Sequence, residues 1–161
     1  MLFKNHHDDK ENLRIIVACC PGEVIPLENL SNDAFSSLIL GDGFGVIADK
    51  NSFNSPSAGV VKDISDNKHE ITIKSDDGFI LIVSVGADSD NNNIEADCLV
   101  NLADRVGPDT KLWDIDVDYY KEKGIDVIAA VVVTTTAEIP AFNINYGKIK
   151  DHCQPVMTIP M

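Results

Sequence analysis

Short apolar segments separated by polar turns run along the chain from residue 13 onward. Most are rich in Ile and Val, side chains that favour a pleated, half-buried sheet surface. The segments expected to form strands are 13–18, 45–48, 59–64, 70–74, 79–85, 127–133 and 155–159. Turn signals fall at 20–22, 41–43, 76–78 and 107–109. This pattern predicts an all-β fold, a single-domain antiparallel β-sandwich or barrel with short helical turns.

Helical signals are brief. Residues 31–40 have room for one or two turns, and 117–123 form a second candidate. Asp116 is placed to cap the start of that second helix, and Gly124 to end it in a left-handed conformation. Residues 1–12 are polar and are expected to form a flexible tail, so that residues 13–161 make up the domain.

The charge balance narrows the classes of partner. The 161 residues carry 13 Lys and Arg against 26 Asp and Glu, a formal net charge of -13. Nucleic acids and anionic lipid surfaces attract clustered cations, so neither is an expected partner, and a protein partner is favoured. Hydrophobic residues make up 44%, enough for a folded core.

The cysteines and the apolar runs indicate the cellular compartment in which the protein is expected. No apolar run approaches the ~18 residues of a membrane-spanning helix, so direct membrane insertion is not expected. The four cysteines show no zinc-site spacing and make a poor disulfide framework. We therefore expect reduced thiols in a cytoplasmic protein, with neither a metal site nor a cofactor.

The segments 70–74 and 79–85 form a predicted β-hairpin that brings a histidine near a serine. With Asp76 and Asp77 as the central turn residues, the pairs facing one another are Ile73 with Ile80, Ile71 with Ile82 and His69 with Ser84. A slip of two residues, with the turn at Asp77 and Gly78, keeps the same residues on one face. Either register gives an Ile-rich face that ends in an imidazole and a hydroxyl. On residue type alone, His69 also fits a half-exposed residue at a strand end.

With these residues in place, the chain resembles the glucose-type enzyme IIA domains of the bacterial phosphoenolpyruvate-dependent sugar phosphotransferase system. The resemblance covers residues 13–160, and its strength lies in the order and spacing of individually weak pieces. Those pieces are GEVIPLE at 22–28, AF at 34–35, GDG at 41–43, SPSAGVV at 55–61, NKH at 67–69, the segments 79–89 and 116–135, and the closing strand from 147.

The resemblance implies a β-sandwich with two facing histidines on neighbouring strands. One of them corresponds to His69. The other is the residue that receives the phosphoryl group in the family, and it falls on Ser84. Asp88 corresponds to an aspartate near the family's site. The family passes phosphate from the carrier HPr to the IIB domain of a sugar permease.

The serine substitution separates two functional hypotheses. A serine hydroxyl is a weak nucleophile without an activating base, and a phosphoserine ester transfers poorly onward. The first hypothesis is therefore a pseudoenzyme-like member that is impaired in phosphoryl relay and acts as a binding or regulatory module for a cytosolic protein. The second is an active phosphocarrier between HPr and a IIB domain during sugar uptake.

The binding face is expected to be apolar and to surround the histidine and the serine. Some of its candidate residues must lie in the core instead. The candidates are Phe35, Leu38, Ile39, Val46, Ile71, Ile80 and Ile82.

Overall fold

The computed structural model describes residues 13–87, 94–134, 139 and 141–160. The tail predicted at residues 1–12 lies outside this part of the chain. The longer strands are β1 (Leu13–Val17), β2 (Gly22–Pro26), β3 (Asp42–Ala48), β5 (Gly59–Ile64), β6 (Glu70–Ser75), β7 (Ile80–Val85), β10 (Lys111–Asp114), β11 (Ile128–Val133) and β14 (Pro155–Pro160). The short strands are β4 (Ser52–Asn54), β8 (Asp97–Cys98), β9 (Arg105–Val106), β12 (Asn143–Ile144) and β13 (Gly147–Ile149). The helical turns are η1 (Leu27–Asn29), α2 (Asp33–Ser36) and α3 (Val117–Glu122).

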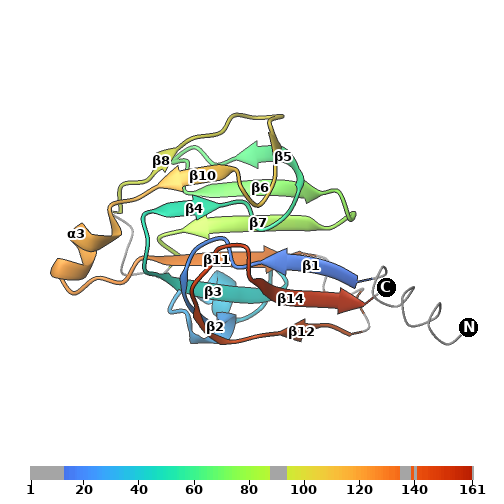
Figure 1. Ribbon diagram of the computed structural model, residues 1–161, viewed down its shortest axis with the longest axis horizontal. Helices are drawn as coiled ribbons and strands as arrows, with labels where there is room; N and C mark the ends of the chain where they lie inside the picture. Colours follow the sequence, from blue (N-terminus) through green and yellow to red (C-terminus); the bar gives the residue numbers. More distant parts are fainter. Residues whose placement is uncertain (1–12, 88–93, 135–138, 140, 161) are drawn as a thin grey trace, which may run out of the picture.

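These strands form three antiparallel sheets. The largest has eight strands in the order β13-β2-β3-β11-β7-β6-β5-β9. The two smaller sheets have the orders β1-β14-β12 and β4-β10-β8. Figure 1 shows most of the strands running along the long axis of the molecule, with α3 projecting at one end. The antiparallel β-sandwich predicted from the sequence is confirmed.

The main core lies between one face of the eight-stranded sheet and the two smaller sheets. Its largest buried side chains come from all three sheets and include Trp113, Phe44, Phe53, Ile16 and Met157. A second, smaller apolar cluster lies on the opposite face of the large sheet, beneath η1 and α2. Its members are Leu27, Leu30, Phe35, Ala87, Ile128, Ala130 and Val132, with Ile25, Leu38, Leu40, Ile47 and Ile82 packed against them.

Strand β11 belongs to both clusters. All six of its residues are buried. Ala129, Val131 and Val133 point into the main core, while Ile128, Ala130 and Val132 point into the second cluster. This alternation follows from the two-residue period of a strand, and burial of both faces explains the uninterrupted apolar run at 127–133.

The predicted helices are confirmed, and α3 has its predicted cap and its predicted glycine stop. The Asp116 carboxylate accepts a hydrogen bond from the Tyr119 N–H, and Gly124 follows α3 with a φ of 76°. The Asn32 side chain caps α2 in the same way, accepting from the Ala34 N–H. Within the described residues, no helix has both the length and the apolar character needed to cross a membrane.

The hairpin between β6 and β7 corrects the predicted register by one residue. Its loop has three residues, Asp76 to Gly78, and Gly78 has a φ of 94°. The extra loop residue makes Ile71 pair with Val83. Because a shift of one position turns every side chain to the opposite face, the Ile-rich face expected around Ile71, Ile80 and Ile82 does not form.

Cys19 and Cys20 are adjacent and buried, and we expect them to make the stability of the fold sensitive to alkaline pH. All four cysteines are free thiols, and burial is the main cause that raises the pKa of Cys20 to about 11. Burial and the neighbouring Cys20 raise the pKa of Cys19 as well. The ordinary thiol pKa is about 9. Between pH 9 and 11 the unfolded chain therefore loses protons that the folded chain keeps, and the free energy of unfolding falls as pH rises.

For Cys20 this loss is expected to reach about 2–3 kcal/mol by pH 11, at about 1.4 kcal/mol per unit of pKa shift. Urea unfolding at pH 7.5 and pH 10.5 measures it. Cys20→Ser removes one thiol titration and should therefore show a smaller decline than the parent. An equal decline in both proteins would contradict a role for this thiol.

Candidate functional site

A shallow depression of about 520 Å³ lies at the open end of the β6–β7 hairpin, away from its loop. It brings together His69 and Ser84, the two residues to which the sequence assigned chemistry. The residues that line it are Asn32, Phe35, Ser65, Asp66, Asn67, His69, Glu70, Ser84, Val85, Gly86 and Ala87.

His69 is positioned by the turn that precedes β6. The Asn67 side-chain oxygen accepts hydrogen bonds from the His69 backbone N–H at 3.0 Å and from the Ser65 hydroxyl at 2.8 Å. Lys68 adopts a φ of 63°, and its carbonyl accepts from the Trp113 indole N–H at 2.7 Å. Since Trp113 is fully buried, this turn is tied to the main core.

Ser84 stands on β7 between two partner strands. It pairs with Glu70 on β6 and with Ala130 on β11. The His69 carbonyl accepts from the Val85 N–H at 2.9 Å, so the position opposite His69 is that of Val85. The predicted direct pair of His69 and Ser84 is therefore displaced by one residue, although both side chains are half-buried and border the same depression.

The depression is acidic. Its described lining contains the carboxylates of Asp66 and Glu70 and no lysine or arginine. Within the described part of the chain, neither the His69 imidazole nor the Ser84 hydroxyl has a side-chain hydrogen bond. A nucleophilic serine requires a base within hydrogen-bond reach, and this arrangement does not supply that contact. The imidazole is free to donate to or accept from a group that enters the depression.

Part of the predicted apolar face does gather beside this site. Phe35 lines the depression, and Leu38 and Ile82 pack with it in the second cluster. Ile39 follows on the surface, with 79% of its area exposed. We call Phe35, Leu38, Ile39 and Ile82 the docking face.

Other residues of the predicted face lie elsewhere. Val46 and Ile71 are fully buried in the main core because their positions in β3 and β6 point away from the depression. Neither can contact a partner. Ile80 is half-buried near the loop end of the hairpin and pairs with Lys74.

The remaining predicted site residue, Asp88, lies outside the described residues. Sequence reasoning missed Glu70, which is the direct cross-strand neighbour of Ser84. The correct hairpin register would have identified it. Among the described residues, three ligand atoms suited to a metal ion come together only at Asp109, His152 and Cys153, which do not line this depression.

Comparison with known proteins places this geometry in a family. Residues 14–139 match the model of the EIIA 1 family of the phosphoenolpyruvate-dependent sugar phosphotransferase system. A "PTS system glucose-specific EIIA component" of Staphylococcus aureus (strain COL) is 30% identical over 132 residues, which are 80% of this chain and 78% of the relative. A "PTS system glucose-specific EIICBA component" of Staphylococcus saprophyticus is 32% identical over 114 residues, 70% of this chain but 17% of that longer protein.

A solved structure shares the fold. The glucose permease IIA from Mycoplasma capricolum has a TM-score of 0.76 with this chain at 22% identity, covering 91% of this chain and 95% of its own. The ordered motifs, the sandwich and the family match agree with one another. The chain therefore belongs to the EIIA 1 family of the phosphoenolpyruvate-dependent sugar phosphotransferase system, as a glucose-type member.

Proposed function

We propose that this chain is a cytoplasmic EIIA-like protein that is impaired in phosphoryl relay and acts by binding protein partners. The observation that carries the proposal is Ser84, which stands where the family resemblance expects the histidine that receives the phosphoryl group. His69, the counterpart of the family's second histidine, borders the same depression.

The chemistry of the depression supports impaired relay. A relay nucleophile needs to be neutral and reactive near pH 7, which suits an imidazole and not an unactivated hydroxyl. Phosphoryl transfer also needs cationic or donor groups around the phosphoryl oxygens. Here Glu70 is the cross-strand neighbour of Ser84, and Asp66 adds a second carboxylate. Both oppose the approach of a phosphate dianion.

The docking face supports protein binding. It presents Ile39 and the rim of an apolar cluster beside the depression, on a chain with a net charge of -13. An apolar centre within an acidic surface fits a partner with an apolar patch ringed by basic residues, because opposite charges steer association. The partner classes are an HPr-like carrier, a permease IIB domain or a regulated cytosolic protein. Because Ser84 is not a histidine, such binding would not be switched by relay phosphorylation.

One observation supports a second candidate function, that of an active phosphocarrier. His69 is half-buried at the rim of the depression and retains an imidazole that a phosphoryl donor could reach. In this alternative the chain is an active phosphocarrier from HPr to a IIB domain, with His69 as acceptor.

One experiment separates the two functions. The protein is incubated with phosphoenolpyruvate, enzyme I and HPr, and acid-labile phosphate on the chain is measured. The proposed function predicts no label, together with chemical-shift changes around the docking face when HPr is titrated in. Ile39→Ser should weaken this association, whereas Ile15→Ser, which removes an exposed isoleucine from β1, should leave it unchanged.

An acid-labile label on the parent that is lost in His69→Gln would establish the active phosphocarrier instead. Absence of both label and HPr association, with no capture of a IIB domain or a cytosolic protein, would contradict the binding role.

A further inference from the structure

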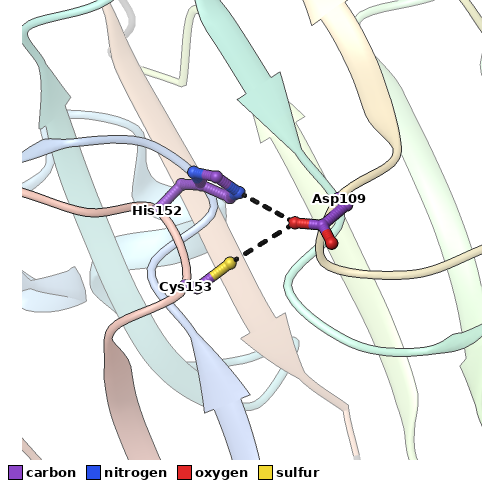
Figure 2. Close-up of side chains that lie close together, drawn as sticks. All are labelled: Asp109, His152 and Cys153. Carbon is purple, nitrogen blue, oxygen red and sulfur yellow. Dashed lines mark hydrogen bonds and ion pairs between the residues drawn. The ribbon is translucent and has the colours of Figure 1, made fainter.

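Three side chains with metal-binding chemistry converge from two loops that are distant in sequence. Asp109 lies in the loop between β9 and β10, and His152 and Cys153 lie in the loop between β13 and β14. Asp109 Oδ1 is 3.5 Å from His152 Nε2 and 3.7 Å from Cys153 Sγ. Figure 2 shows the imidazole and the thiol both directed at the same carboxylate oxygen. All three ligand atoms lie within 4.8 Å of one another.

These separations match the edges of a tetrahedral zinc site. Bond lengths of about 2.0 Å to nitrogen and oxygen and about 2.3 Å to sulfur place the oxygen about 3.3 Å from the nitrogen and about 3.5 Å from the sulfur. The observed distances of 3.5 Å and 3.7 Å are close to both values. The third pair, His152 Nε2 and Cys153 Sγ, lies within 4.8 Å, and a tetrahedral edge between nitrogen and sulfur is about 3.5 Å. Side-chain rotation would therefore be needed to bring all three atoms onto one ion.

A second observation concerns the imidazole nitrogen itself. His152 Nε2 is buried and has no hydrogen-bond partner within the described residues. Buried polar atoms are normally hydrogen-bonded, and the 3.5 Å contact of this nitrogen with Asp109 is an ion pair only if the imidazole is protonated. On a neutral imidazole, Nε2 can bind a metal ion instead. His152 Nδ1 lies 3.5 Å from Asp151 Oδ1. A proton on Nδ1, facing this carboxylate, would leave the lone pair of Nε2 available to a metal ion.

Both loops are held by hydrogen bonds. Asp151 Oδ1 accepts from the Cys153 backbone N–H at 2.9 Å, and the Gln154 N–H donates to the Asp151 carbonyl at 3.1 Å. In the other loop, the Asn54 side chain donates to the Pro108 carbonyl at 3.0 Å, next to Asp109. These hydrogen bonds position the ligand-bearing segments without using the three ligand atoms, which lowers the cost of assembling a site.

The chemistry of the donor set selects the ion. A thiolate, an imidazole and a carboxylate together suit Zn²⁺, whereas the all-oxygen sites of Mg²⁺ and Ca²⁺ contain no sulfur. We propose that Asp109, His152 and Cys153 bind a Zn²⁺ ion, with the fourth coordination position open to water. Binding forms a Zn–S bond, breaks the S–H bond of the Cys153 thiol and releases its proton to solvent.

Cobalt supplies the direct test, because Co²⁺ occupies such sites and its bond to a thiolate gives a near-ultraviolet charge-transfer band. The chelator-treated full-length protein is titrated with Co²⁺ and then with Zn²⁺. We expect the band to saturate at one Co²⁺ per chain and to disappear when Zn²⁺ displaces it. Cys153→Ser should abolish the band. Each of Asp109→Ala and His152→Gln should lower the affinity for Zn²⁺ at least about 100-fold, because mutating a residue that only supports a metal ligand already lowers metal affinity by about 10–100-fold.

Matched controls separate this site from the other thiols and histidines. Cys98→Ser removes another partly exposed thiol and should keep the band. The variants H6Q/H7Q and His69→Gln should also keep it. Circular dichroism and urea unfolding without metal check that Cys153→Ser is folded. Failure of the parent to give a saturable band, or loss of the band in a control variant instead of Cys153→Ser, would overturn the proposal.

Discussion

Ser84→His is expected to turn the chain into a phosphoryl acceptor for HPr. The change restores an imidazole at the position that the family resemblance assigns to the acceptor, beside His69 in a depression of about 520 Å³. Ser84 is half-buried at the edge of this space, so the larger side chain has room without entering the core. Acid-labile label from phosphoenolpyruvate should rise from undetectable in the parent to most of the chain in the variant.

Three further variants test which side chains contribute to the phosphorylation of Ser84→His. Ser84→Ala removes the hydroxyl and should behave as the parent does. Adding His69→Gln to Ser84→His should slow labelling about 100-fold, the cost typical of losing one group that stabilises transition-state charge. Glu70→Gln in the same background should speed it, because a carboxylate next to the acceptor repels phosphate. If Ser84→His folds and binds HPr but gains no label, the site has lost more than its nucleophile.

Gly43→Ala is expected to destabilise the protein by about 3 kcal/mol or more, a large part of the 5–15 kcal/mol typical of a domain. Gly43 lies on β3 opposite Val132 of β11. A Cβ atom there would meet the Val131 carbonyl oxygen at 1.9 Å, far inside van der Waals contact and against backbone that cannot rotate away. Strands β3 and β11 would have to separate locally, with loss of ladder hydrogen bonds.

Gly107→Ala provides the matched control. A Cβ atom at that position meets nothing within 4 Å, and its φ does not lie in the left-handed region. This variant should stay within about 0.5 kcal/mol of the parent or gain slightly through a stiffer unfolded chain. Urea unfolding of both variants measures the difference. A Gly43→Ala midpoint equal to that of Gly107→Ala would show that the strands accommodate the methyl group.

Local patterns were enough to predict most of the longer strands and both α-helices, although β2 (Gly22–Pro26) was missed. Strand β5 (Gly59–Ile64) has the predicted bounds, and α3 begins directly after its predicted Asp116 cap. Strands such as β4 and β10 were missed because three or four residues are too few to show a period. Trp113 shows the consequence: it is the largest fully buried side chain, in a segment that the pattern left unassigned.

The site was harder to predict because it depends on pairing between strands. One additional loop residue at the β6–β7 turn moved the position opposite Ser84 from His69 to Glu70. The same shift directs Ile71 into the core. The proximity of Asp109 and Cys153 could not be predicted from their spacing in the sequence. They lie in two loops distant along the chain, which the packing of the three sheets brings together.

Strand β11 also limits when the fold can be completed during synthesis. It forms ladders with β3 on one side and β7 on the other, and among the strands that the structure describes no other joins these two parts of the large sheet. Until residue 133 has left the ribosome, strands 22–48 and 59–85 share no neighbour within that sheet. The nascent chain therefore exposes two long strand edges, at β3 and at β7, which are open to pairing with other chains. In the finished protein both edges are covered, so the risk of aggregation is concentrated in the interval before β11 is translated.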